Sequence, residues 1–122
     1  MSTEHRTAIV KVFVTKPLEI EEPDWCAGHR DDRAEFKADI THHGREHVLE
    51  VGGFPLFRAM LAQAPYSQHA PSVPALYVEQ LDLTGSYTPD EVEDLADALV
   101  EAAARLRALG RELDAVLEEE GR

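Results

Sequence analysis

Residues 88–120 have the sequence TPDEVEDLADALVEAAARLRALGRELDAVLEEE, and they set the layout of the chain. Thr88 is a typical helix N-cap, Pro89 suits the first helical position, and Glu91 completes a capping box three residues after the threonine. Apolar residues then follow at alternating steps of three and four, the heptad pattern of a long helix. The sequence therefore predicts one helix over about residues 89–120, with an apolar stripe formed by Val92, Leu95, Leu99, Ala102, Leu106, Leu109, Leu113 and Val116.

This helix is expected to be longer than the sheet that it covers. Roughly 32 residues span about 48 Å, whereas strands of about six to nine residues reach roughly 20–30 Å. About a third of the helix would then extend past the sheet. Either Gly110 breaks the helix so that its end folds back, or the stripe meets a second copy in a symmetric homodimer. A second copy, or another protein, is the partner expected to cover Leu106, Leu109, Leu113, Val116 and Leu117.

Two other segments have the composition of β-strands. Residues 7–15, TAIVKVFVT, are rich in β-branched residues and carry apolar side chains on both faces, which predicts an interior strand. Residues 75–83, ALYVEQLDL, predict another strand, whereas the short apolar run 54–64 fits a strand or a helix. Together with residues 38–51, these segments predict a single α+β domain over residues 1–122. Its strands lie within 7–83 and form a four- or five-stranded, mostly antiparallel meander with one long C-terminal helix.

Residues 38–51, ADITHHGREHVLEV, predict a β-hairpin. A two-residue turn at Gly44-Arg45 would use the positive φ that glycine readily adopts. This register places His42 opposite His47 on a face that is otherwise apolar and includes Leu49 and Val51. Because a shift of one residue would send every side chain to the other face, this sorting supports the register. The opposite, mostly polar face consists of Asp39, Thr41, His43, Glu46, Val48 and Glu50.

The single cysteine and several histidines lie in this part of the sequence. Cys26, His29, His42 and His47 follow the pattern C-x2-H-x12-H-x4-H, which is close to the spacing of compact zinc sites with one cysteine replaced by histidine. In the predicted hairpin the Cβ atoms of His42 and His47 lie about 4.5–5.5 Å apart, so both imidazoles can reach one ion. His43 becomes a ligand only if the register shifts by one. The pattern therefore predicts zinc, with Cys26, His29, His42, His47 and His43 as candidate ligands.

Two other interpretations of these residues stay open. In the first, the histidine pair is hydrogen-bonded at the rim of the core and Cys26 is a small apolar residue. In the second, Cys26 is a nucleophile and His29 its base, although no third orienting group is evident in the sequence. The acidic run over residues 19–24 is expected to be a solvated loop.

Composition excludes several classes of protein. The chain has 122 residues, 24 acidic and 12 basic, and a net charge of −12, which argues against non-specific binding to nucleic acid. One cysteine allows no intramolecular disulfide framework, and no apolar run approaches the roughly 20 residues of a membrane span. The first residues, MSTEHR, lack the basic and apolar regions of a signal peptide. We therefore expect a cytoplasmic protein with no membrane partner.

Three segments resemble a family of small actinobacterial proteins, of the kind found in Streptomyces, with no established activity. They are residues 23–29 (PDWCAGH), residues 42–44 (HHG) and residues 87–99 (YTPDEVEDLADAL). The resemblance covers most of residues 23–104 and implies that residues 55–63 form a strand. His47 lies outside the family pattern. The characteristic positions that the resemblance implies are Trp25, Cys26, His29, His42 and His43.

The patterns favour a small non-enzymatic regulatory or adaptor protein with a structural zinc site and helix-mediated self-association. An enzyme that uses the cysteine and histidine cluster, with a metal or with Cys26 as nucleophile, is the first alternative. An acidic inhibitor that mimics the charge of DNA is the second alternative. That inhibitor would need regularly spaced carboxylates along one face, which the sequence does not show.

Overall fold

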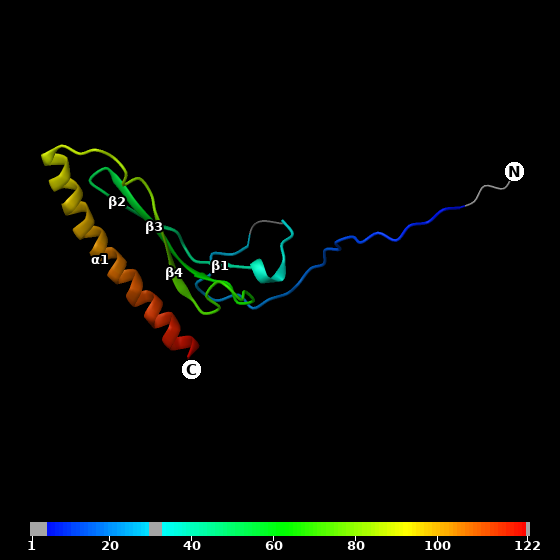
Figure 1. Cartoon of the computed structure of the whole chain (residues 1–122). Coiled ribbons are helices and arrows are strands. Elements are labelled where there is room, and N and C mark those ends of the chain that lie inside the picture. Colours follow the sequence, from blue (N-terminus) through cyan, green and yellow to red (C-terminus); the bar gives the residue numbers. More distant parts are fainter. Residues whose placement is uncertain (1–4, 30–32, 122) are drawn as a thin grey trace.

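The computed structural model describes residues 5–29 and 33–121, and it confirms an α+β fold (Figure 1). A four-stranded antiparallel sheet carries one long helix along one face. None of the helices in the described ranges has the length and apolar character needed to cross a membrane. In chain order the elements are the 3₁₀ turn η1 (Lys37–Asp39), β1 (His42–His43), β2 (His47–Val51), β3 (Phe54–Gln63), β4 (Ala75–Gln80) and α1 (Pro89–Glu120).

The central strand of the sheet is β3. Strand β4 pairs along one edge of β3 in unbroken register, from Phe57 opposite Gln80 to Ala62 opposite Ala75. Strands β1 and β2 follow one another along the other edge of β3. Strands β2, β3 and β4 therefore form the expected meander, and the ambiguous run 54–64 belongs to its central strand.

The predicted hairpin at Gly44-Arg45 is wrong, because β1 and β2 do not pair with each other. His43 of β1 lies opposite Ala62, and His47 of β2 lies opposite Ala59. The four steps in sequence from His43 to His47 therefore match only three steps along β3. The extra residue makes a bulge. Gly44 donates its backbone N–H to Leu61 O at 2.8 Å, and a Cβ on Gly44 would lie 3.2 Å from the Cβ of Leu61. Glycine is therefore needed here for close approach and not for a turn.

The reversal of the chain occurs instead at Gly52-Gly53, between β2 and β3. Both residues have positive φ, +58° and +85°, the conformation that a two-residue hairpin turn of the primed kind requires. The predicted faces are nevertheless largely correct, since the bulge keeps His42, His47 and Leu49 on the buried side. His42 and Leu49 are buried and His47 is half-buried, whereas the exposed positions are His43, Glu46, Val48 and Glu50.

Helix α1 forms the second layer, and its capping box is present as predicted. The Thr88 side chain accepts from Glu91 N, and Glu91 accepts from Thr88 N. The helix buries Ala98 and Ala102 against Leu56 of β3, whose side chain is fully buried. Small side chains at these helix positions let α1 approach the sheet closely. Partly buried residues around this core are Val51, Phe54, Phe57, Leu83 and Leu95.

The helix is unbroken at Gly110, and its C-terminal apolar stripe is partly used within the chain. Leu109 is buried and lines a small hollow with Leu61 and Leu76. Strand β3, with ten residues, is longer than expected and helps the sheet to reach this part of the helix. Part of the stripe that is expected to extend past the sheet is therefore covered within the chain. Leu106, Leu113 and Val116 are half-buried, and Leu117 is exposed.

The predicted strand over residues 7–15 joins no sheet in the described part of this chain. The segment is extended, has no regular secondary structure, and runs away from the domain (Figure 1). Its apolar side chains are exposed, with Ile9 at 101% and Phe13 at 90% of full accessibility. The prediction of an interior strand is therefore wrong for the isolated chain.

Candidate metal centre

A tight loop over residues 23–29 brings Cys26 and His29 together. Cys26 donates its backbone N–H to Pro23 O at 3.0 Å, which closes a turn. Gly28 has φ +99°, a conformation that residues with a Cβ rarely adopt, and it lets the backbone bend around the cysteine. Ala27 donates to His43 O at 2.8 Å, so the loop is fixed to the outer edge of β1.

The third member of the cluster, His42, comes from β1 itself. Its position opposite Gln63 of β3 directs the imidazole to the buried side, and only 2% of the residue is exposed. The edge of the Trp25 ring packs against this imidazole, with centroids 6.3 Å apart and an interplanar angle of 86°. Burial and ring packing therefore fix the orientation of His42.

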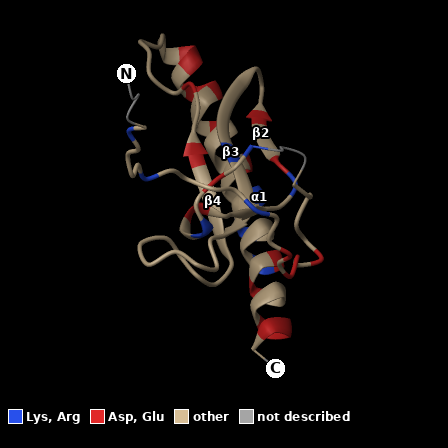
Figure 2. Ribbon diagram, turned by 90° about the vertical axis from the view of Figure 1, so that its right-hand side faces the viewer, with Lys and Arg blue, Asp and Glu red and all other residues tan. Residues whose placement is uncertain are grey.

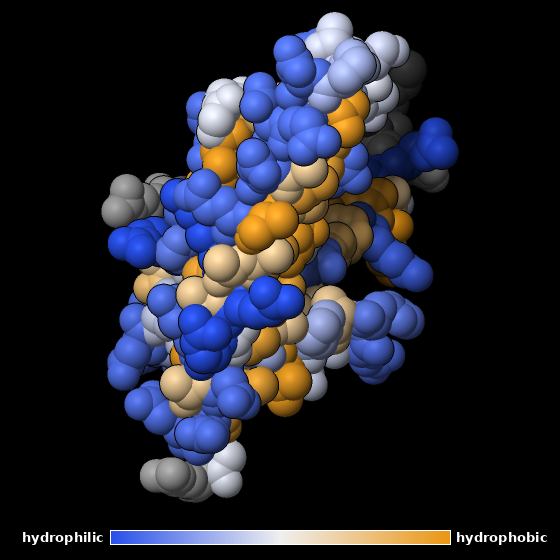
Figure 3. All heavy atoms as spheres, turned by 90° about the vertical axis from the view of Figure 1, so that its left-hand side faces the viewer, coloured by the Kyte–Doolittle hydropathy of each residue, from blue (hydrophilic) through white to orange (hydrophobic). Residues whose placement is uncertain are grey.

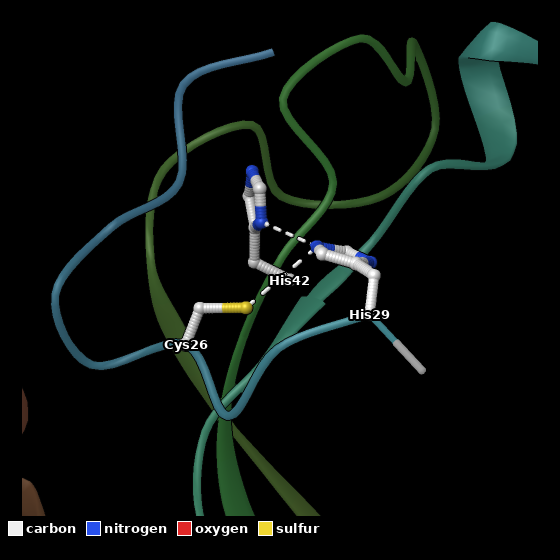
Figure 4. A group of neighbouring side chains, drawn as sticks. All are labelled: Cys26, His29 and His42. Atoms are coloured by element: carbon white, nitrogen blue, oxygen red, sulfur yellow. Dashed lines mark hydrogen bonds between the residues drawn. The ribbon is translucent and has the colours of Figure 1, made fainter. Parts of the chain in front are cut away.

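The donor atoms of Cys26, His29 and His42 converge on one point (Figure 4). His29 Nε2 lies 3.2 Å from His42 Nδ1 and 3.7 Å from Cys26 Sγ. All three donor atoms lie within 4.8 Å of one another. Two segments that are separate in the sequence thus present one sulfur and two nitrogens to the same small volume.

Two of the three separations, those that involve His29 Nε2, fit a tetrahedral metal ion. Zinc–nitrogen distances of about 2.0–2.1 Å and a zinc–sulfur distance of about 2.3 Å place two nitrogens about 3.4 Å apart and a nitrogen and a sulfur about 3.6 Å apart. The corresponding distances here are 3.2 Å and 3.7 Å. A mixed thiolate and imidazole set also suits zinc better than magnesium or calcium, which prefer oxygen.

The surroundings set the protonation of the cluster. Burial lowers the pKa of His42 below its ordinary value and the neighbouring His29 lowers it further, while Glu22 offsets part of the effect, and the balance favours the neutral imidazole that a metal ion binds. Burial raises the pKa of the Cys26 thiol, and Glu22 adds to this, while a backbone hydrogen bond from Gly28 offsets part of the effect. A metal ion that binds here must displace the thiol proton.

Glu22 is a fourth group at the site that sequence analysis missed. Its Oε1 lies 3.9 Å from His29 Nε2, and its carboxylate also acts on the Cys26 thiol. The acidic run 19–24 had been assigned to a solvated loop, and nothing in its composition separates Glu22 from its neighbours. The one available signal is position, because Glu22 precedes the turn that begins at Pro23.

The other two candidate ligands lie outside this cluster. His43 is exposed and lines an open hollow with Glu46, Arg58 and Tyr77 on the face of the sheet away from α1. His47 is half-buried on the helix side, where it lines a hollow with Trp25 and Leu109. The structure therefore brings together three of the five predicted ligands and separates His42 from His47, which the hairpin would have placed side by side.

Comparison with known families matches residues 7–115 to a domain of unknown function, DUF6907. The chain belongs to this family. Searches of curated proteins and of solved structures each found no match to the chain. The resemblance to a family without an established activity is thus confirmed at this level, while the actinobacterial origin stays a prediction.

Proposed function

We propose that this DUF6907 protein is a small non-enzymatic regulatory or adaptor protein in which a zinc ion, held by Cys26, His29 and His42, joins the loop 22–29 to the sheet. The observation that carries this proposal is the convergence of three donor atoms, from two segments, within 4.8 Å of one another, with the two separations from His29 Nε2 close to those of tetrahedral ligands. A zinc ion in this place would supplement the backbone hydrogen bond from Ala27 to β1.

The group available for the fourth coordination position of the metal ion favours a structural role. Structural zinc sites have four protein ligands, whereas catalytic sites keep one position for water. Glu22, at 3.9 Å from His29 Nε2, is within a small side-chain movement of the cluster. With the carboxylate as fourth ligand the site is closed, and its effect is to hold the loop rather than to activate a substrate.

Elemental analysis of the purified protein, without chelator, tests the proposal. We expect about one zinc per chain in the wild type and a loss of tight binding in Cys26→Ser and His42→Ala, because each removes one donor. His43→Ala and His47→Ala are matched controls that remove a histidine outside the cluster, and both should keep the metal. Equal metal content in all these proteins, or none in the wild type, would refute the site.

Cobalt substitution separates the structural site from a catalytic one. Tetrahedral cobalt with a thiolate ligand gives intense visible bands and a sulfur-to-metal charge-transfer band. In a closed site, Glu22→Gln should change the visible bands, and added azide should not change those of the wild type. An azide-dependent spectrum in the wild type would show an open position and support the enzymatic alternative.

Self-association through α1 is a separate proposal. Several apolar side chains remain among hydrophilic ones on the outer side of the helix (Figure 3). Val92, Leu99 and Val100 are exposed at 49%, 41% and 73%. If this surface binds a second copy, Leu99→Glu/Val100→Glu should dissociate the assembly in sedimentation experiments, whereas Glu101→Gln, an exposed neighbour, should not. An unchanged mass for both variants would exclude a helix-mediated dimer.

A further inference from the structure

Residues 7–15 form an extended segment with the composition of a strand, and no strand in the described part of the chain pairs with it. The segment lies within residues 7–115, the range that matches the family domain. Its side chains alternate across an extended backbone and are apolar on both sides. The exposed members are Ile9 at 101%, Val10 at 73%, Val12 at 74%, Phe13 at 90% and Val14 at 83%.

Local contacts direct this segment away from its own sheet. The rings of Phe13 and Phe36 meet edge to face, with centroids 6.0 Å apart, so the segment is held beside the residues that precede η1. Pro17 restricts Lys16 to an extended conformation and thereby continues the direction of the segment. In Figure 1 the segment points away from β4 and from the helix.

Strand β4 offers the edge that such a segment needs. One edge of β4 pairs with β3 without a bulge, and no other strand in residues 5–29 or 33–121 pairs with β4. The strand contains no proline or lysine, and its single charged side chain, Glu79, is bound by Arg58. Tyr77 and Val78 are exposed at 46% and 45%. A regular edge of this kind, whose one charge is paired, readily accepts another strand.

The opposite edge of the sheet is less suitable. At β1 the loop residue Ala27 already donates to His43 O. Between β1 and β2 the bulge at Gly44 interrupts the row of backbone groups, and a second irregularity follows Leu49. Natural proteins use bulges of this kind to prevent pairing at an edge.

Charge also favours binding of the segment to the body of this same protein. Residues 5–16 contain Arg6, Lys11 and Lys16 and no acidic residue, while the rest of the chain has 9 basic and 24 acidic residues, a net charge of −15. Figure 2 shows only basic positions along the described N-terminal segment and several acidic ones on the domain. A basic segment is therefore attracted to an acidic second copy.

We propose that residues 7–15 of one chain pair with the free edge of β4 in a second copy, and that reciprocal exchange gives a symmetric dimer with five strands in each sheet. Nine residues are enough to cover the six of β4. Backbone hydrogen bonds supply the pairing, and the added strand withdraws its apolar side chains from water. The exchange joins a segment and a sheet edge with which no strand in the described part of the chain pairs.

The first test compares two substitutions at one position. Val12→Pro removes a backbone N–H and disrupts strand pairing, whereas Val12→Thr keeps the N–H and a β-branched side chain. In sedimentation at tens of micromolar, the wild type and Val12→Thr should be dimers, and Val12→Pro should be a monomer. An unchanged zinc content and an unchanged far-UV circular dichroism signal of the helix would show that Val12→Pro is folded. A monomeric wild type, or a dimeric Val12→Pro, would overturn the proposal.

The second test locates the contact. In a mixture of nitrogen-labelled and carbon-labelled chains, nuclear Overhauser effects should connect residues 7–15 of one chain with 75–80 of the other. The amides of both segments should become more protected from exchange as concentration rises. Protection that is independent of concentration in a monomer would mean that the segment folds back on its own chain. A dimer broken by Leu99→Glu/Val100→Glu but not by Val12→Pro would assign the interface to α1 instead.

Discussion

Helix α1 and the segment 7–15 both have clear sequence patterns, but the helix packs one face against the sheet of its own chain, whereas the described part of the chain offers the segment no strand to pair with. The helix buries Ala98, Ala102 and Leu109 against the sheet. The segment leaves Ile9 and Phe13 almost fully exposed. A local pattern thus predicts the conformation of a segment, whereas the place where it packs depends on the remainder of the fold and, for residues 7–15, on a second molecule in our proposal.

The largest difference between the two regions should appear on truncation of their apolar side chains. Leu56→Ala removes a fully buried side chain beneath α1 and should lower the free energy of unfolding by about 2–5 kcal/mol. Ile9→Ala removes an exposed one and should change the stability of the monomer by less than about 0.5 kcal/mol. Urea unfolding at low protein concentration measures both. A large effect of Ile9→Ala in a monomer would mean that the segment packs within its own chain.

Removal of the metal should have the next largest effect, and it concerns the loop between the two regions. If zinc is present at about 100 times its dissociation constant, its removal lowers the free energy of unfolding by about 2.7 kcal/mol. A strong chelator should therefore lower the melting temperature of the wild type and leave that of Cys26→Ser unchanged. Hydrogen exchange should accelerate at residues 23–28 and remain slow in the centre of α1. Uniform acceleration would contradict a local role of the ion.

Substitution of two glycines, one in the sheet and one in the helix, should change stability in opposite directions. A Cβ on Gly44 would lie 3.2 Å from the Leu61 Cβ and 3.3 Å from Trp25 O, so Gly44→Ala should destabilise the protein by about 1–3 kcal/mol. Nothing lies within 4 Å of a Cβ on Gly110, so Gly110→Ala should stabilise the helix by up to about 1 kcal/mol. Thermal unfolding of both variants measures these opposite signs. A neutral Gly44→Ala would contradict the bulge.

The parts of the fold that were predictable are those that depend on neighbours in the sequence. The capping box and the heptad steps predict α1, and the spacing of Cys26, His29 and His42 singles out the residues that the structure brings together. The hairpin at Gly44 was not excluded by its pattern, because a bulge and a turn both keep alternate side chains on the same faces. Gly52-Gly53 was the better turn signal, since both of its residues adopt positive φ.

The rest depends on contacts between distant residues. Glu22 approaches the metal cluster only because Ala27 is fixed to β1, and no local pattern encodes that hydrogen bond. Residues 7–15 have the composition of a strand, but the predicted interior strand is wrong for the isolated chain, and their apolar faces do not indicate which edge would cover them. A sequence pattern identifies the surface that must be buried and does not identify the molecule that buries it.

The smallest effect is expected at the start of α1, where the structure is most local. Hydrogen bonds from Thr88, first from its backbone N–H, lower the pKa of Glu91 below its ordinary value. The stability that the carboxylate contributes is therefore fully present above about pH 4.3, the ordinary glutamate range, and is lost as the pH falls through the lower pKa of the folded state. Glu91→Gln keeps a hydrogen-bond acceptor without the charge. Its stability should consequently be slightly below that of the wild type at pH 7 and should converge with it in acid, as measured by urea unfolding at both pH values. A difference that stays constant with pH would mean that the charge of Glu91 contributes nothing to the cap, and that hydrogen bonding alone sets where the helix begins.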